Sequence, residues 1–181
     1  MTIRIAVLFA AAAIAVSACS GGGKAHSAKP ASAAATTTTL DPQAAARAEV
    51  LAAYEAYNRF YVLAIGTPDP KNPDLNTYLT GAALARMRLE LQGFASTHEG
   101  IRLSDVSNDP PLVVSVDPAR AVVDDCTRSI AHYFDVRTGQ AEGAPPATAA
   151  TSAGLEFVFV KDAGAWKLFE KNNQPSACQH A

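Results

Sequence analysis

The chain has 181 residues, with 15 lysines and arginines against 17 aspartates and glutamates, so its formal net charge is −2. A surface that binds nucleic acid needs a cluster of basic side chains, and the sequence contains no such cluster. The composition therefore argues against nucleic acid as a partner. The length leaves room for one domain of about 140 residues behind an N-terminal leader.

The first 18 residues have the features of a secretory signal peptide. Arg4 is the only charged residue before Cys19, and an unbroken apolar run follows it from residue 5 to residue 16. This run is shorter than the roughly 20 apolar residues that a membrane-spanning helix needs. The sequence VSAC at residues 16–19 resembles the bacterial lipobox, in which the cysteine is acylated and becomes the mature N-terminus. The alternative is an ordinary signal peptide whose cleavage site lies beside a cysteine.

Residues 19–40 are predicted to form a flexible tether. They are rich in glycine, alanine, serine and threonine and show no apolar periodicity, so they cannot bury enough surface to fold. We expect residues 1–18 to be the signal peptide and residues 41–181 to be a single domain. A diacylglyceryl and palmitate anchor on Cys19 would hold that domain at the outer, extracytoplasmic face of the cell membrane.

Once Cys19 is assigned to lipid, the chain retains two cysteines, Cys126 and Cys178. Disulfides persist in an exported protein, and an even pair is most economically a bridge. Closing a loop of about 50 residues would stabilise the fold by roughly 4 kcal/mol in the chain-entropy model. Metal binding is the weaker alternative, because the sequence has no CxxC and no HxxxH motif.

One long amphipathic helix is predicted after Asp41, which suits an N-cap and is followed by proline at the first helical position. Gly66 and Pro68 end this helix. Apolar residues recur at spacings of three and four, as expected for a helix with one buried face, at Ala46, Val50, Ala53, Tyr57, Phe60 and Ala64, with Tyr54, Tyr61 and Ile65 widening the stripe.

Two further helices are predicted before residue 100. Residues 72–80 indicate a short helix, and Thr80 begins a longer one that ends at Gly100. The apolar spacing of this longer helix places Arg86 and Glu90 on its outer, solvent-facing side.

Beyond residue 100 the apolar spacing changes to two, which is typical of strands. Separate strands are predicted over residues 101–106, 111–116, 121–128, 132–140, 155–160 and 166–170, with a loop over residues 142–154. The last two strands form the clearest hairpin. Helices followed by an antiparallel meander predict an α+β domain with N-terminal helices packed on one face of a curved antiparallel sheet.

This order of elements resembles the nuclear-transport-factor-2-like superfamily, also called the cystatin-like cone. The supporting motifs are a tyrosine-bearing first helix and the closing hairpin KDAGAWKLFE. The chain is also similar to actinobacterial lipoproteins of that fold, through TYLTG at residues 77–81, Asp125-Cys126 and Thr138-Gly139. The resemblance covers Asp41 to about Cys178. It implies a conical pocket between sheet and helices and no single function, because the superfamily includes enzymes and adaptors.

An enzyme on such a fold would need an acid or base inside the cone, and isomerases of this kind combine an aspartate with a tyrosine. The candidate residues are Asp125, His132 and Tyr61, with Asp124 as an alternative to Asp125. Adjacent residues of a strand point to opposite faces, so only one of the two aspartates can enter the cone. The sequence has no glycine elbow for a serine nucleophile and no zinc or phosphate-binding motif, so no metal and no cofactor is expected.

Two functions are therefore carried forward. The favoured hypothesis is a non-enzymatic, membrane-anchored lipoprotein whose domain binds an apolar small molecule or another envelope protein. The alternative is an isomerase- or dehydratase-like enzyme that uses Asp125 or His132 as its base.

Overall fold

A computed structural model describes residues 42–141 and 151–179. The signal peptide, Cys19 and the tether predicted above lie outside the described residues. The described chain forms three α-helices, five strands and a 3₁₀-helix: α1 (Pro42–Gly66), α2 (Leu75–Tyr78), α3 (Gly81–Thr97), β1 (Glu99–Asn108), β2 (Leu112–Val116), β3 (Arg120–Asp135), β4 (Thr151–Asp162), β5 (Ala165–Asn173) and η1 (Pro175–Gln179). No described helix is long and apolar enough to cross a membrane.

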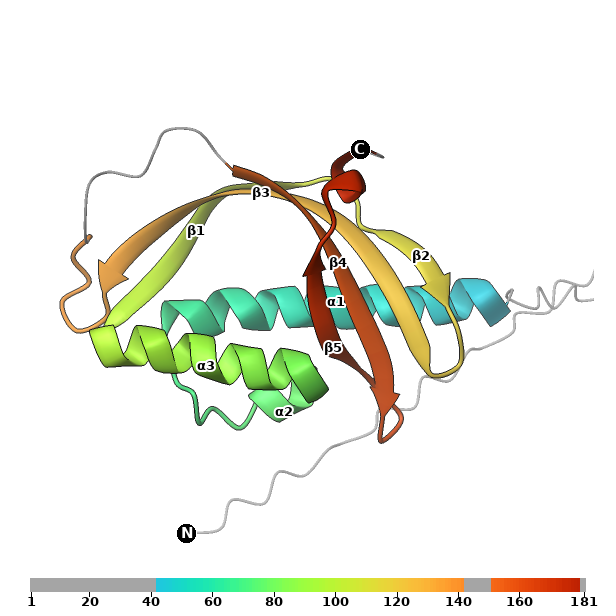
Figure 1. Cartoon of the computed structure of the whole chain (residues 1–181), viewed down its shortest axis with the longest axis horizontal. Coiled ribbons are helices and arrows are strands. Elements are labelled where there is room, and N and C mark those ends of the chain that lie inside the picture. The colour runs from blue at the N-terminus through green and yellow to red at the C-terminus, as the bar shows by residue number, and fades with distance from the viewer. Residues whose placement is uncertain (1–41, 142–150, 180–181) are drawn as a thin grey trace, which may run out of the picture. The chain divides into compact units, whose positions relative to one another are not determined.

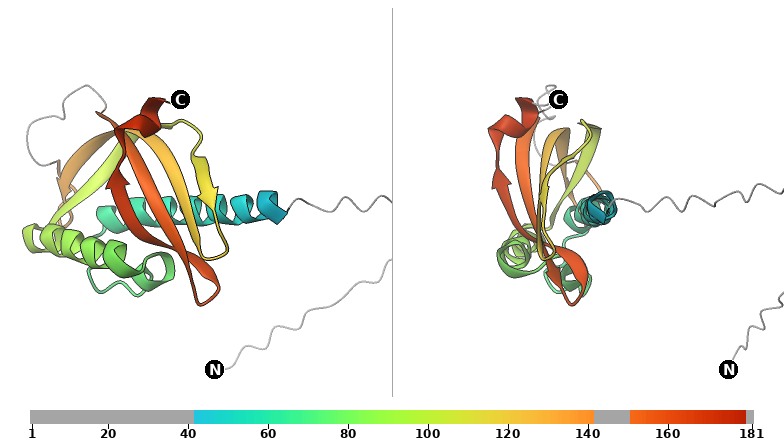
Figure 2. Two further views of the ribbon diagram at one scale, coloured as in Figure 1. Left: turned by 45° about the vertical axis from the view of Figure 1, so that its right-hand side comes forward. Right: turned by 90° about the vertical axis from the view of Figure 1, so that its right-hand side faces the viewer.

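The five strands form one antiparallel sheet in the order β1-β3-β4-β5, and β2 pairs with β3 as well. The long strand β3 carries both shorter strands on one side: β1 pairs with its C-terminal part and β2 with its N-terminal part. The sheet curves over α1 and α3, which both lie on its concave side (Figure 1; Figure 2). The predicted fold class, α+β with N-terminal helices on a curved antiparallel sheet, is confirmed.

The apolar stripe predicted for the first helix is the face that α1 buries. Its buried residues are Val50, Tyr54, Tyr57, Phe60, Ala64 and Ile65. They pack against the concave face of the sheet, where Val123, Phe157, Phe159 and Leu168 are each at most 1% exposed. Removing these apolar side chains from water supplies the main stabilisation of the domain.

The predicted strands 121–128 and 132–140 are in fact one strand, β3, which runs without a break from Arg120 to Asp135. The prediction of two strands was wrong because residues 129–131 lack strict apolar alternation. The irregularity lies in the partner strand: β1 has a bulge between Ser104 and Ser107, and β3 itself is uninterrupted. The sheet therefore has fewer and longer strands than the sequence indicated.

The closing hairpin is present and is longer than predicted. β4 begins at Thr151, within the stretch predicted to be a loop, and residues 142–150 of that stretch lie outside the described residues. Ala163 and Gly164 form its two-residue turn, with φ of 51° and 85°. Two successive positive φ values are those of a type I′ turn, whose twist matches that of the flanking strands.

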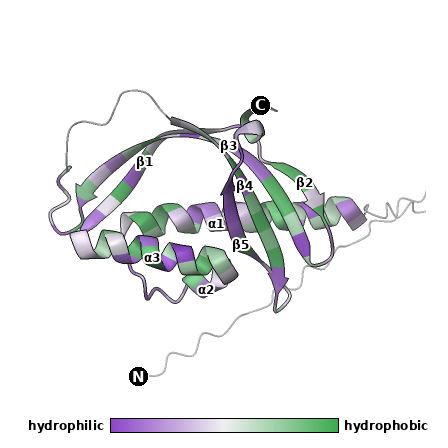
Figure 3. Cartoon of the chain, in the orientation of Figure 1, coloured by the Kyte–Doolittle hydropathy of each residue, from purple (hydrophilic) through white to green (hydrophobic). Residues whose placement is uncertain are grey.

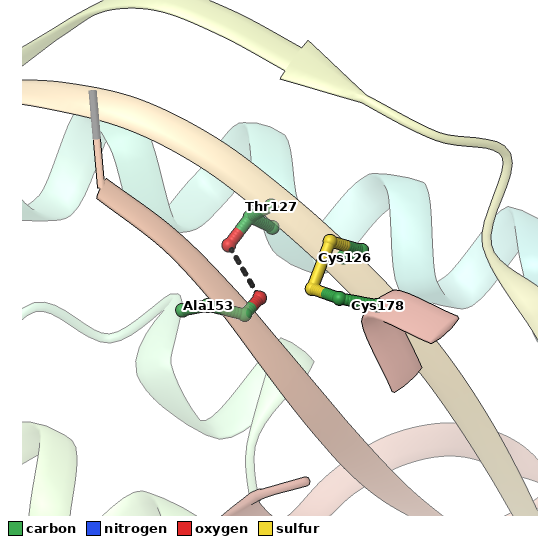
Figure 4. Close-up of a disulfide and its surroundings, with 4 residues drawn as sticks. All are labelled: Cys126, Thr127, Ala153 and Cys178. Atoms are coloured by element: carbon green, nitrogen blue, oxygen red, sulfur yellow. Dashed lines mark hydrogen bonds between the residues drawn. A yellow bond between two sulfur atoms is a disulfide. The ribbon is translucent and has the colours of Figure 1, made fainter. Parts of the chain in front are cut away.

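The predicted disulfide joins Cys126 of β3 to Cys178 of η1, across a sequence separation of 52 residues (Figure 4). η1 is held against the end of β4 by a second contact, in which the Gln174 amide donates to the carbonyl of Gly154 at 2.8 Å. The odd-numbered residues Val123 and Asp125 of β3 face the core, so Cys126 lies on the opposite, convex face. The disulfide fastens the C-terminal segment to the outside of the sheet.

Candidate functional site

A pocket of about 260 Å³ lies between α1, α3 and β5, on the concave side of the sheet. An apolar cavity of about 150 Å³ already admits benzene, so this pocket has room for a small organic molecule. Apolar and polar side chains both line it: Tyr57, Tyr61, Leu79, Ala82, Ala83, Arg86, Met87, Glu90, Leu155, Leu168, Glu170, Lys171, Asn172 and Asn173. Figure 3 shows that β5 is largely hydrophilic, whereas β4 beside it is largely hydrophobic.

Lys171 is directed into the core side of β5 by an irregularity of the strand. In β4, Val158 pairs with Glu170 of β5, and the next residue, Phe159, pairs with Leu168. Phe169 therefore has no partner in β4 and forms a bulge in β5. Strict alternation from Leu168 would point Glu170 inward. Because of the bulge, Lys171 instead shares the inner face with its partner Phe157, which is 1% exposed.

The ammonium of Lys171 lies against aromatic rings. Its Nζ is 4.9 Å from the centroid of the Tyr61 ring and 5.5 Å from that of Phe157. Within the described residues no carboxylate comes within ion-pairing distance of this Nζ. Burial lowers the pKa of Lys171, with Glu90 opposing and Arg86 adding to that shift. Contacts between a cation and ring faces offset part of the cost of burial and do not neutralise the charge.

Arg86 and Glu90 are among the residues that line the pocket. Arg86 is exposed, as predicted for the outer side of the helix, and Glu90 is half-buried. They lie on α3 at positions i and i+4, on the part of the helix that borders the pocket beside β5. The Arg86 guanidinium donates a long hydrogen bond, 3.5 Å, to the backbone carbonyl of Lys171. Periodicity along a helix shows which side is apolar and cannot show that a second element covers the polar side.

Tyr61 and Tyr57 contribute aromatic walls with hydroxyl groups. Burial raises the pKa of Tyr61 to about 12, and the charge of Glu90 acts in the same direction. Burial also raises the pKa of Tyr57. Both phenols are therefore neutral hydrogen-bond donors at physiological pH. Tyr61, a candidate from the sequence, does lie in the pocket.

Asp125 is buried in the core of the domain. The side chain is 2% exposed, and the Tyr54 hydroxyl of α1 donates a hydrogen bond to its Oδ2 atom. Burial raises the pKa of Asp125, while the bond from Tyr54 and the charge of Lys171 oppose that rise. Neither Asp125 nor Tyr54 is among the described residues that line the pocket. Tyr54 was predicted only as part of the helix stripe, and its link to Asp125 spans 71 residues of sequence.

His132 is on the other face of the sheet. It pairs with Arg102, whereas the neighbouring pair Leu103 and Ala131 packs against the core, so His132 points away from the cone. Its Nε2 atom is 2.6 Å from the Ser104 hydroxyl. Asp124 also lies on the convex side, because Asp125 faces inward. The structure thus places Asp125 and Tyr61 on the concave side and separates His132 from both.

The part of the chain that the structure describes contains no group of three or more histidine, cysteine, aspartate or glutamate side chains that could hold a metal ion. The only cysteines in that part are joined in the disulfide.

Comparison with known proteins gives the fold and nothing narrower. No family model matches the chain, and no curated protein matches it. Among solved structures, the intermembrane space region of chloroplast protein ARC6 is similar, with a TM-score of 0.54 and 21% identity, over 72% of this chain and 97% of that one. An uncharacterized protein with a cystatin-like fold from Caulobacter vibrioides matches with a TM-score of 0.37 and 14% identity, over 75% of this chain and 95% of that one. The ARC6 region supports the α+β architecture alone.

Proposed function

We propose that this chain is a lipoprotein, anchored through Cys19 at the outer face of the cell membrane, whose domain binds a small molecule without catalysing a reaction. The observation that supports ligand binding is the 260 Å³ pocket, whose lining is divided about evenly between apolar and polar side chains. Small-molecule sites combine apolar surface with polar groups that fix the orientation of the ligand. Binding of an envelope protein is the competing outcome of the test below.

Catalysis by Asp125 or His132 is the second candidate, and the geometry does not favour it. A general base must come within hydrogen-bond reach of the proton that it removes. Asp125 is 2% exposed and hydrogen-bonded to Tyr54, and His132 is on the convex face, so neither is presented to the pocket. The observation in favour of an enzyme is the buried Asp125–Tyr54 pair, since such pairs hold perturbed pKa values.

Anchoring is tested by the variant Cys19→Ser. We expect the unaltered chain to incorporate labelled palmitate and to sediment with membranes, because two or more acyl chains give stable attachment. Cys19→Ser should lose the label and leave the membrane fraction. Cys126→Ser, in a cysteine that the structure pairs with Cys178, is the matched control and should remain acylated. A labelled, membrane-bound Cys19→Ser protein would refute the proposal.

Ligand binding is tested by native mass spectrometry of the full protein, extracted from its own membranes. A bound mass of small-molecule size, released on unfolding, is the expected result. The substitution Ala83→Phe would fill the pocket, since Ala83 is one of its lining residues and is 7% exposed. That variant should release the extra mass while remaining folded. A stoichiometric protein partner that persists in Ala83→Phe would favour the adaptor hypothesis instead.

A further inference from the structure

The side chains that line the pocket include both cations and carboxylates. Lys171 and Arg86 supply two positive charges there, and Glu90 supplies one negative charge. Glu170 also borders the pocket, but it pairs with Val158, whose neighbours Phe157 and Phe159 face the core, so its carboxylate belongs to the opposite face of the sheet. Among the charged side chains on the pocket side of α3 and β5, two cations therefore accompany one carboxylate.

The surplus charge is poorly compensated. Lys171 makes two ring contacts, and within the described residues its ammonium has no ion pair. Lys171 is half-buried. Partial burial of an ammonium without a counter-ion has a desolvation cost, and an arriving anion would offset it. The Arg86 guanidinium lies 3.5 Å from the backbone carbonyl of Lys171, and both side chains line the same pocket. Arginine also matches a carboxylate with two parallel hydrogen bonds.

The rest of the pocket suits an uncharged body. Met87, Leu155 and Leu168 line it, and the aromatic walls of Tyr57 and Tyr61 complete it. At about 260 Å³ it exceeds the roughly 150 Å³ that accommodate benzene and falls just below the range for drug-sized ligands. A single ring or a short acyl chain with one polar end has the matching size.

We infer that the pocket binds a small organic monocarboxylate, with the carboxylate between Lys171 and Arg86 and the apolar body against Met87, Leu155 and Leu168. A phosphate monoester carries close to two charges at neutral pH and would be repelled by Glu90, whereas a carboxylate carries one. The inference rests on the proposed ligand-binding function and adds the chemical class of the ligand.

The test uses the full-length acylated protein in nonionic detergent and three probes of matched size. These are 4-fluorobenzoate, the neutral 4-fluorobenzyl alcohol and the cationic 4-fluorobenzylamine, each followed by fluorine NMR. We expect the carboxylate to bind at least about tenfold more tightly than the alcohol, a difference of about 1.4 kcal/mol. The amine should bind least, because Lys171 and Arg86 repel it.

Variants assign the preference to these side chains. Lys171→Met keeps the length of the side chain and should reduce carboxylate affinity at least about tenfold, with alcohol affinity unchanged. Lys171→Arg should retain the preference, and Glu90→Gln should tighten carboxylate binding. Lys167→Met is the matched control on the same strand, since Lys167 pairs with Asp162 and does not line the pocket. Melting curves check that each variant is folded.

The outcomes separate the inference from the proposed function. Equal binding of carboxylate and alcohol, or a Lys171→Met protein that keeps the preference, would overturn the monocarboxylate inference and leave ligand binding intact. Failure of all three probes to bind, together with no co-purifying small molecule, would overturn both.

Discussion

At the scale of single residues, Asp125 places a carboxyl group within the apolar core. It is 2% exposed and is hydrogen-bonded by Tyr54, and its Oδ1 atom has no partner of good geometry among the described residues. Buried polar groups lose more when their partner is removed than they gain when the bond forms. The position of α1 against β3 must therefore keep the Tyr54 hydroxyl within hydrogen-bond distance of the Asp125 carboxyl.

Tyr54→Phe tests this requirement. The substitution keeps the ring, which packs edge-on against Phe157 at 5.1 Å, and removes only the hydroxyl. Leaving a buried carboxyl without its donor should lower the free energy of unfolding by about 1–3 kcal/mol. Urea denaturation measures the change. Tyr133→Phe, at a tyrosine that is 46% exposed, is the matched control and should stay within about 0.5 kcal/mol of the original protein. Equal effects of the two variants would show that the Asp125–Tyr54 bond adds nothing.

The pH dependence of stability gives a second test. Burial raises the pKa of Asp125 above its unfolded value, against the opposing effects of the Tyr54 bond and the Lys171 charge and with a small contribution from Asp109. The folded protein then holds the proton more tightly than the unfolded chain. The stabilisation is complete below the unfolded pKa of about 3.9 and is lost as the pH rises through the folded pKa.

Asp125→Asn removes this titration and retains an oxygen that can accept from Tyr54. The stability of the unaltered protein relative to Asp125→Asn should therefore fall as the pH rises from about 4 towards neutrality. Thermal melts of both proteins across this range measure the difference. A relative stability that rises with pH would instead mean that Tyr54 and Lys171 outweigh burial and depress the pKa.

At the scale of elements, the sequence predicted what depends on local periodicity. The buried face of α1 and the β4–β5 hairpin were both predicted, because each repeats its apolar residues at the period of its own backbone. The disulfide could also be predicted from the sequence, because an even number of cysteines remains once Cys19 is assigned to the lipid. These features need no knowledge of the neighbouring elements.

The pocket could not be predicted in the same way. Lys171 points inward because Phe169 is an extra residue in β5, and a bulge depends on the pairing with β4 and not on the residues of β5 alone. Arg86 and Glu90 lie on the polar side of α3, and the packing of α3 beside β5 makes these side chains border the pocket although Arg86 is still exposed. The charged groups of the candidate site thus result from register and curvature, which are properties of the assembled sheet.

The attachment of η1 provides a prediction at this scale. Gly154 lies so close to the C-terminal segment that a Cβ atom there would be 2.2 Å from the carbonyl oxygen of Gln174. Gly154→Ala should therefore push η1 off the sheet and lower the free energy of unfolding by about 1–3 kcal/mol. Hydrogen exchange of the amides of Gln174 and Ala177, which are bonded in the structure, should become faster.

Gly93→Ala is the control for that substitution. Gly93 is within α3, and a Cβ atom at this position would meet nothing within 4 Å. The same chemical change should here stabilise the protein by about 0.8–1 kcal/mol, because alanine is the better helix former. If Gly154→Ala lowers the free energy of unfolding and Gly93→Ala raises it, the close approach of Gln174 to Gly154 is the cause of the destabilisation. A neutral Gly154→Ala would show that η1 can shift at no cost.

At the scale of the whole molecule, the proposed organisation is a lipid at Cys19, a tether and one domain closed by a disulfide. The polar, glycine-rich composition of residues 20–40 predicts that a protease reaches them more easily than the packed domain. The proline- and alanine-rich residues 142–150 are predicted to be a second accessible segment, and they separate the two cysteines of the disulfide.

Brief subtilisin digestion of the membrane-bound protein tests this arrangement. We expect cleavage within residues 20–40 to release a soluble fragment that begins before Pro42, the first residue of α1. Cleavage within residues 142–150 should leave the two pieces joined, because Cys126 lies in one and Cys178 in the other. A non-reducing gel should then show one band and a reducing gel two. Pieces that separate without reductant, or a released fragment that begins inside α1, would contradict the proposed organisation, since both would mean that the disulfide or the helix fails to hold the domain together.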